Sequence, residues 1–227
     1  MDAATSSPRR LADDVQVERI ELGSGAWVDV ARGLLLDHQR VHDELEATVS
    51  WQQGRVFRYE RWIDEPRLGG FQRADSMHPA LAEAQAWITD RYRVRFDGVA
   101  LARYRHAADS VGFHRDRELR WLEETVIGVL TTGAHRPFLM RPIGERRTAH
   151  DDDMVAGAGS TFDLSPAGGD LLVMGGRCQA AWLHAVPKVT GGAAVRDRIS
   201  AQWRWTSRRG RPDTNPGYSA PRTYGRR

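Results

Sequence analysis

The spacing of hydrophobic residues changes near residue 99, and this change divides the chain into two predicted regions. In residues 37–49, Val41, Leu45 and Val49 recur at intervals of four, which predicts an amphipathic helix lying on a core. Residues 79–92 show the same pattern and predict a second helix. We therefore expect two helices to pack against whatever the second region forms.

Between the two predicted helices, residues 56–62 alternate with aromatic side chains, a pattern typical of a strand. Pro66 and the Gly69-Gly70 pair follow, and these residue types favour turns. This segment is expected to be a strand followed by a turn.

After residue 99, short apolar runs alternate with clusters of glycine, proline and aspartate, which indicates an antiparallel sandwich or barrel. The candidate strands span residues 99–104, 111–116, 124–130, 137–141, 160–164, 170–174, 182–186 and 198–205. Residues 145–159 are polar and predict a loop. Eight strands suit a jelly roll, so the expected fold class is mainly β with flanking helices, an α+β arrangement around a double-stranded β-helix core.

Four segments follow from these patterns. Residues 1–16 lack apolar periodicity and are expected to form a flexible leader, and residues 17–98 hold the N-terminal helices and the strand-turn segment. Residues 99–206 form the predicted jelly-roll core. Residues 207–227 are a basic tail that three prolines make irregular.

The composition excludes several classes of protein. Hydrophobic residues make up 41% and charged residues 28% of the 227 residues, which suits one globular domain. No apolar run approaches the roughly 20 residues needed to cross a bilayer, and the N-terminus lacks the apolar core of a secretory signal. We therefore expect a cytoplasmic protein. Cys178, the only cysteine, excludes an internal disulfide and is expected to be a buried, inert thiol.

Positive charge gathers at the C-terminal end of the sequence. The net charge is +3, and residues 204–227 contain seven arginines and one aspartate. Guanidinium groups bind phosphate oxygens, so this composition is consistent with contact to nucleic acid. A solvated tail without a partner explains the same composition, and both interpretations stay open.

A metal site is predicted by the tripeptide that contains His114 and Asp116. Side chains two residues apart on a strand point to the same face, so imidazole and carboxylate can reach one ion. His184 is the best candidate for the third ligand, which completes the 2-His-1-carboxylate arrangement that binds iron(II). His38 and His42 also have a metal-binding spacing on a helix, but they lack a third ligand and are expected on a solvated face.

The last predicted strand carries a second chemical signal. Arg198, Ser200 and Arg204 lie at even spacing, so all three can face one cavity and donate hydrogen bonds to a dicarboxylate. The alternative is a solvated strand face. It is disfavoured because Ile199 and Trp203 form an apolar opposite face, which indicates a strand of the core.

Six motifs occur in order between residues 99 and 204: Ala102-Arg103-Tyr104, Gly112-Phe113-His114-Arg115-Asp116-Arg117-Glu118, Arg136-Pro137-Phe138, Gly169-Asp170-Leu171-Leu172-Val173-Met174, Trp182-Leu183-His184-Ala185-Val186-Pro187 and Arg198-Ile199-Ser200 through Arg204. Together they resemble the catalytic core of the AlkB family of Fe(II)- and 2-oxoglutarate-dependent dioxygenases. The resemblance covers nearly half of the chain.

The resemblance implies an iron site and a cosubstrate site that share one cavity. Iron(II) is expected on His114, Asp116 and His184, which would also be the catalytic centre. The side chains expected to bind 2-oxoglutarate, which is used together with O2, are Tyr104, Arg198, Ser200 and Arg204.

Three positions depart from the family pattern. Members usually have Asn where this chain has Ala102 and Ser200, so two amide contacts to the cosubstrate are lost or shortened. The residue after the metal-binding aspartate is often acidic in the family, whereas it is Arg117 here. Glu118 remains as an expected contact to the substrate base.

Upstream, the Arg55-Val56-Phe57 and Pro66-Arg67 segments resemble the nucleotide-recognition region of the branch that acts on double-stranded DNA, which implies a nucleotide-recognition hairpin packed on the core. The tyrosine-rich sequence expected after the second segment is missing. Phe57, Trp62 and Phe71 are candidate platforms for stacking on an extruded base. Packing in the core is the alternative role for each of these three side chains.

The function implied by the resemblance is direct reversal of alkylation damage. The enzyme would oxidise the N-methyl group of a flipped base in DNA or RNA and release formaldehyde, succinate and CO2. The expected partner is nucleic acid, with no membrane, and the protein is expected to be a monomer. Two alternatives stay open: hydroxylation of a small-molecule or protein substrate, and nucleic-acid binding by a degenerate dioxygenase.

Overall fold

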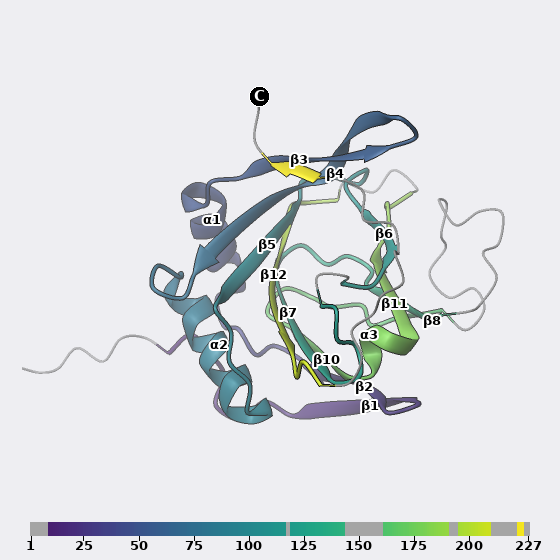
Figure 1. Cartoon of the computed structure of the whole chain (residues 1–227). Coiled ribbons are helices and arrows are strands. Elements are labelled where there is room, and N and C mark those ends of the chain that lie inside the picture. The colour runs from purple at the N-terminus through teal and green to yellow at the C-terminus, as the bar shows by residue number, and fades with distance from the viewer. Residues whose placement is uncertain (1–8, 117–118, 144–160, 191–194, 210–221, 225–227) are drawn as a thin grey trace, which may run out of the picture.

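Two antiparallel sheets lie around a shared interior in the computed structural model, which describes residues 9–116, 119–143, 161–190, 195–209 and 222–224 (Figure 1). The larger sheet has nine strands in the order β1-β2-β10-β7-β12-β5-β4-β3-β13. The smaller sheet has four strands in the order β6-β11-β8-β9. The predicted loop at residues 145–159 lies outside the described residues.

The strands of the larger sheet, in their order across it, are β1 (Val17–Gly23), β2 (Ala26–Ala31), β10 (Leu171–Gly176), β7 (Thr125–Gly133), β12 (Arg198–Thr206), β5 (Gly98–Tyr104), β4 (Arg61–Arg73), β3 (Gln52–Arg58) and β13 (Arg222–Tyr224). Those of the smaller sheet are β6 (Val111–His114), β11 (Trp182–Val186), β8 (Leu139–Pro142) and β9 (Phe162–Asp163). The helices are α1 (His38–Thr48), α2 (Pro79–Tyr92) and α3 (Cys178–Ala181).

The two sheets are held together by one buried apolar cluster. Ile127 and Val129 of β7 meet Met140 of β8 and Val186 of β11 in this cluster. Fully burying side chains of this size stabilises a fold by about 1.5–3 kcal/mol each, so the cluster fixes the sheets face to face. All eight strands predicted between residues 99 and 205 are present, and the predicted jelly-roll class is confirmed.

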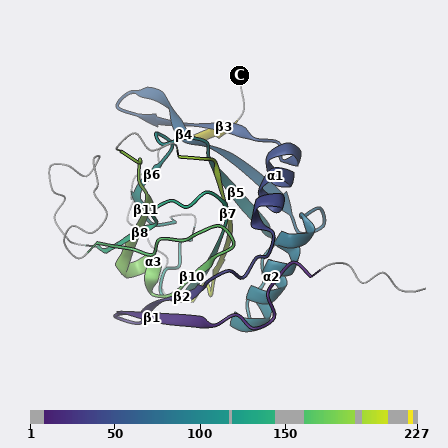
Figure 2. The same ribbon diagram turned by 180° about the vertical axis from the view of Figure 1, so that it is seen from behind.

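Helices α1 and α2 cover the outer face of the larger sheet (Figure 2). Val41 and Leu45 of α1 and Leu81 and Ile88 of α2 are buried in one cluster with Trp203 of β12. Both helices therefore lie where the apolar spacing predicted them. Of the described helices, none is long and apolar enough to span a bilayer.

Strand β12 separates the helix-covered side of the sheet from the interior of the jelly roll. Ile199 and Trp203 point to the helices, whereas Arg198 and Ser200, which are also buried, point to the interior. This alternation is the consequence of the two-residue period of a strand. The predicted division of β12 into an apolar face and a polar face is therefore observed.

The segment between α1 and α2 is a hairpin, as the family resemblance implied, and it is longer than the strand and turn that the sequence pattern predicted. Strands β3 and β4 are joined at Tyr59 and Glu60, which adopt left-handed backbone conformations, and β4 continues through the predicted turn residues. Pro66 is tolerated because it lies where the pairing register with β3 shifts, so its missing N–H interrupts no regular ladder. Gly70 is required for space, since a Cβ there would lie 2.6 Å from Cγ1 of Val49.

Both ends of the chain add strands that the hydrophobic pattern did not predict. Strands β1 and β2 extend one edge of the larger sheet, and β13 pairs with β3 at the other edge. The prediction of a wholly irregular tail is therefore wrong for residues 222–224. In the predicted leader, Leu11 pairs with Leu35, and Ala12 donates a backbone hydrogen bond to Leu34.

The single cysteine lies at the start of α3. Cys178 is fully buried, and this burial raises the pKa of its thiol to about 12. A thiol that stays protonated is a poor nucleophile. The prediction of a buried thiol is confirmed.

Candidate active site

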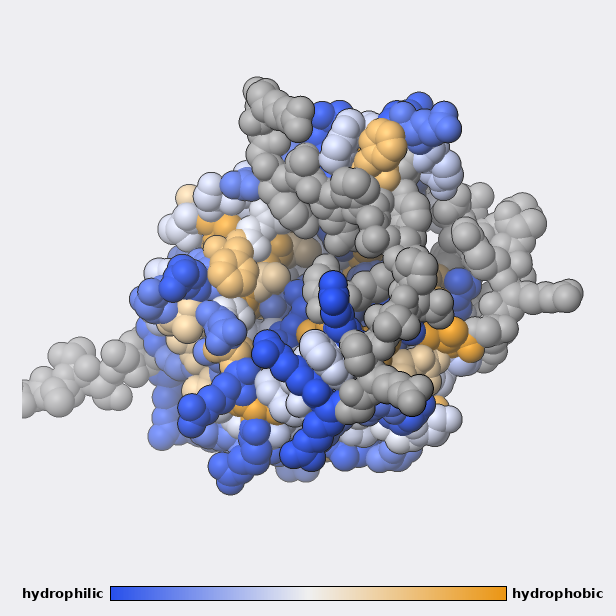
Figure 3. All heavy atoms as spheres, in the orientation of Figure 1, coloured by the Kyte–Doolittle hydropathy of each residue, from blue (hydrophilic) through white to orange (hydrophobic). Residues whose placement is uncertain are grey.

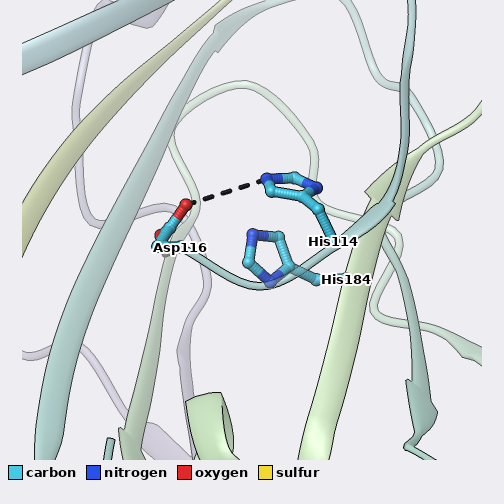
Figure 4. Close-up of side chains that lie close together, drawn as sticks. All are labelled: His114, Asp116 and His184. Atoms are coloured by element: carbon cyan, nitrogen blue, oxygen red, sulfur yellow. Dashed lines mark ion pairs between the residues drawn. The ribbon is translucent and has the colours of Figure 1, made fainter. Parts of the chain in front are cut away.

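Two histidines from neighbouring strands of the smaller sheet face each other across the ladder. His114 of β6 is the register partner of His184 of β11, and their ring centroids are 4.3 Å apart (Figure 4). Nδ1 of His114 lies 2.9 Å from the carbonyl oxygen of Gly112, so its N–H can donate there and leave Nε2 for a metal. The ring of Phe138 stacks on His184 and fixes its orientation.

Asp116 completes the group, although not in the way its spacing predicted. Strand β6 ends at His114, so the expectation that residues 111–116 form one strand is wrong for its last two residues. Asp116 is nevertheless buried, with Oδ1 3.7 Å from Nε2 of His114. The candidate ligand atoms of His114, Asp116 and His184 all lie within 4.8 Å of one another, a spacing that suits one metal ion.

The electrostatic environment keeps these three side chains in the protonation states that bind a metal. Burial lowers the pKa of His184 to about 3 and also lowers the pKa of His114, so both imidazoles are neutral near pH 7. Burial alone would raise the pKa of Asp116. The charge of Arg204, whose Nε is 3.0 Å from Asp116 Oδ2, acts together with the two histidines against burial, and their combined effect holds that pKa far below its ordinary value.

A cluster of cationic side chains surrounds Tyr104 on the interior face of β5. Arg136 and Arg198 are fully buried, and their guanidinium carbons lie 5.4 Å and 5.9 Å from the centroid of the Tyr104 ring. The Tyr104 hydroxyl accepts a hydrogen bond of 3.5 Å from Arg67. Tyr104 and Arg198 are also register partners on β5 and β12.

Neither buried arginine has a carboxylate partner among the described residues. Arg198 donates to the carbonyl oxygen of Arg136 and to the Thr131 hydroxyl, and burial lowers its pKa to about 10. Arg136 donates only to backbone carbonyl oxygens, including those of His106 and Asp109. Two unneutralised buried cations are costly, and a dianionic ligand would offset that cost.

Ser200 also faces this interior. It is buried, and its hydroxyl oxygen has no hydrogen-bond partner among the described residues. Its register partner on β5 is Ala102, so the two positions at which the family usually has Asn lie side by side. The structure therefore brings Tyr104, Arg198 and Ser200 together, while Arg204 lies further along β12 against Asp116.

A second group of potential metal ligands lies outside the interior and already has a cation. His42, Glu46 and Asp197 bring their ligand atoms within 4.8 Å of one another, but Arg103 forms ion pairs with both carboxylates. His42 is buried against Thr132, so the prediction that it lies on a solvated face is wrong. The reason is that α1 turns this histidine toward β7.

The aromatic side chains predicted to stack on a base are divided between two places. Phe57 and Trp62 are half-exposed register partners on the β3–β4 hairpin and form an edge-to-face pair with centroids 5.6 Å apart. Figure 3 shows apolar surface over this hairpin with hydrophilic side chains around it. Phe71 is exposed on β4, four residues or about 13 Å along the strand from Arg67. Glu118 lies outside the described residues.

The hairpin lies beside the strand that carries His114, as Figures 1 and 2 both show. The backbone N–H of Ser110, just before β6, donates to the carbonyl oxygen of Pro66 on β4 at 2.7 Å. The part of the hairpin around Pro66 therefore adjoins the start of the strand that carries His114.

A jelly roll that contains a 2-His-1-carboxylate group is typical of non-haem iron(II) oxygenases. The chain belongs to the 2OG-Fe(II) oxygenase superfamily, whose family model matches residues 37–209. Members of this superfamily are oxidoreductases that use Fe(II) as cofactor and 2-oxoglutarate and O2 as cosubstrates, and this chain has candidate residues for binding both the metal and the dicarboxylate.

Within this superfamily the sequence is AlkB-like. It is 28% identical over 167 residues to alpha-ketoglutarate-dependent dioxygenase alkB homolog 3 of Bos taurus, a match that covers 68% of this chain and 57% of the relative. The protein of that name from Homo sapiens is 26% identical over 183 residues, covering 75% and 63%. The chain thus spans about three-fifths of the length of these relatives.

Solved structures show the same fold. A 2OG-Fe(II) oxygenase family oxidoreductase from Burkholderia pseudomallei is 15% identical, with a TM-score of 0.50 and coverage of 84% of this chain and 89% of that chain. A prolyl hydroxylase from Trichoplax adhaerens, solved with a peptide fragment of hypoxia inducible factor, is 10% identical, with a TM-score of 0.52 and coverage of 78% and 83%.

The stability of the metal-free protein is expected to fall on acidification. The unfolded chain binds a proton at His184 near pH 6.5, whereas the folded chain binds it only near pH 3, so a falling pH favours the unfolded state between these values. Protonation of His184 in the unfolded chain lowers the free energy of unfolding by at most about 1.4 kcal/mol for each unit by which the pH falls. Urea titrations between pH 7 and about 4 measure the slope, and His184→Gln should reduce it. An unchanged slope in that variant would contradict the assigned cause.

Proposed function

We propose that this protein oxidatively demethylates N-alkylated bases in DNA or RNA and so reverses alkylation damage directly. In this proposal His114, Asp116 and His184 hold iron(II), and the cosubstrate-binding side chains are those predicted: Tyr104, Arg198, Ser200 and Arg204. The observation that carries the cosubstrate part of the proposal is the buried pair Arg136 and Arg198, which lacks a carboxylate partner among the described residues.

The charge of the interior fits 2-oxoglutarate. The cosubstrate is a dianion, and Arg198 supplies a buried guanidinium for one carboxylate, with Ser200 as a further donor. Arg67 links this cluster to the metal ligands, because it donates to Tyr104 and its charge lowers the pKa of both His114 and His184. The two halves of the site therefore share one electrostatic environment.

When bound, iron(II) with 2-oxoglutarate and O2 supplies oxidation of a C–H bond, while 2-oxoglutarate becomes succinate and CO2. The residues of this chain prepare the site for that chemistry. Arg204 and the two histidines favour ionised Asp116, burial keeps both imidazoles neutral, and Phe138 stacks on the His184 ring. An N-hydroxymethyl product breaks down to formaldehyde and the restored base, so no further acid or nucleophile is needed.

The choice of a nucleic-acid substrate is supported by three observations. The sequence relatives are alkB homolog 3 proteins, at 28% and 26% identity. The hairpin beside β6 presents the half-exposed Phe57–Trp62 pair, and an aromatic face can stack on an extruded base. The arginine excess of residues 204–227 suits a polyanion.

Formaldehyde and succinate release test the reaction and the substrate together. Iron-loaded protein with 2-oxoglutarate should release both products on oligonucleotides that contain 1-methyladenine or 3-methylcytosine. His114→Ala should release neither, because it removes a metal ligand. Succinate without formaldehyde on any methylated oligonucleotide would favour a hydroxylase of small molecules or proteins. Failure to form either product would contradict the assigned site.

Loss of the Arg198 guanidinium is expected to weaken 2-oxoglutarate binding. A hydrogen bond to a charged group contributes about 1.5–3 kcal/mol, so Arg198→Met should raise the KM for 2-oxoglutarate by about 10- to 100-fold. Succinate formation at increasing 2-oxoglutarate concentration measures this change. Arg19→Met removes an arginine that pairs with Asp29 at the far edge of the larger sheet and serves as the control. Equal KM values in the two variants would exclude the assigned role.

The hairpin pair is expected to act on the substrate and not on the cosubstrate. Base stacking contributes about 1–3 kcal/mol, so Trp62→Ala should lower kcat/KM for a methylated oligonucleotide by about 5-fold or more. The slow succinate formation without oligonucleotide should not change, because Trp62 lies on the hairpin outside the cosubstrate cluster. A parallel loss of both rates would show that the substitution disturbs the fold instead.

A further inference from the structure

Asp116 needs an anchor that its own strand does not supply. Strand β6 ends at His114, so the regular ladder no longer fixes the backbone two residues later. Arg204 holds the carboxylate of Asp116, and the backbone carbonyl oxygen of Asp116 accepts a hydrogen bond of 3.2 Å from Leu119, but neither contact pairs its backbone N–H. A carboxylate that serves beside two imidazoles must point toward them, so its backbone has to be fixed as well.

The side chain of Gln179 provides this anchor. Its Oε1 accepts a hydrogen bond of 2.7 Å from the backbone N–H of Asp116, across a separation of 63 residues. Both residues are buried, and Gln179 is fully so. Loss of a hydrogen bond between two buried groups is costly, because the N–H left without a partner cannot form a hydrogen bond with water instead.

The position of Gln179 in the fold links this contact to a second metal ligand. Gln179 belongs to α3, the single short helix that leads from β10 directly into β11, where His184 lies five residues later. The segment formed by α3 and β11 thus carries the candidate ligand His184, and it also accepts a hydrogen bond from the backbone of the candidate ligand Asp116. Their relative position is set by α3 as much as by the sheet.

We propose that Gln179 is a positioning residue for the metal centre, which orients Asp116 toward His114 and His184. This inference rests on the proposed role of the three side chains as iron ligands. Partners that orient a ligand typically change metal affinity by about 10- to 100-fold when they are removed. Gln179 touches no reacting atom, so it acts only through Asp116.

Three variants separate positioning from general stability. Gln179→Met keeps the length of the side chain and removes the acceptor, whereas Gln179→Glu keeps an acceptor oxygen at the same reach. Gln85→Met is the matched control, because Gln85 accepts a hydrogen bond of 3.1 Å from the buried Trp203 indole on the helix-covered side of β12. It also removes a glutamine acceptor from a buried N–H, away from the candidate ligands.

The measurement is binding of Mn(II) to the full-length protein without O2, followed by the electron paramagnetic resonance signal of the free ion. Gln179→Met should bind Mn(II) about 10-fold or more weakly, Gln179→Glu should recover much of the affinity, and Gln85→Met should match the wild type. Wild-type affinity in Gln179→Met, or an equal loss in Gln85→Met, would overturn the inference.

Two further measurements keep the result unambiguous. The amide of Asp116 should exchange slowly with deuterium in the wild-type protein, and fast exchange would overturn the inference even if Gln179→Met did not fold. Asp116→Ala sets the affinity expected when the carboxylate is absent. If Asp116→Ala binds Mn(II) as tightly as the wild type, the proposed ligand set fails, which is a different outcome from failure of Gln179 to position it.

Discussion

Two arginines buried without a carboxylate partner among the described residues are the constraint around which the interior is organised. Arg136 and Arg198 remain charged there because backbone carbonyl oxygens, the Thr131 hydroxyl and the face of Tyr104 partly replace water. Such an interior is stable only as part of a larger apolar frame. The cluster that joins the two sheets and the helices behind β12 provide that frame, so the packing of both sheets and the two helices supports two buried charges that no carboxylate of the described residues neutralises.

The sequence was most informative where the spacing of apolar residues along one segment decides whether that segment is a helix or a strand. The four-residue spacing in α1 and the alternation along β12 are local properties, so helices, core strands and the polar face of Arg198 and Ser200 followed directly. His114 and His184 could be paired by chemistry and by the resemblance, before their register was known. The confirmed helices and strands therefore share one cause, which is that neighbouring residues already determine them, whereas the two histidines were paired by their chemistry.

The features that could not be predicted depend on contacts between distant segments. Nothing near Asp116 reveals that a glutamine 63 residues later fixes its backbone, or that β6 ends before it. His42 was expected on the solvated face of its helix together with His38, but it is buried because α1 packs on β7. Pro66 and Gly70 have the composition of a turn, yet a register shift and a close side chain explain them within β4. Arg136 lies outside any strand, so alternation gave no sign of its burial.

The C-terminal strand has a consequence for the behaviour of the molecule in concentrated solution. Strand β13 occupies the outer edge of β3, which would otherwise expose a row of unpaired backbone N–H and C=O groups. An uncovered edge is a template on which the strand of a second molecule can add. Because β13 pairs with residues 54–56 within its own chain, a strand from a second molecule could add at this part of the edge only after β13 had left it.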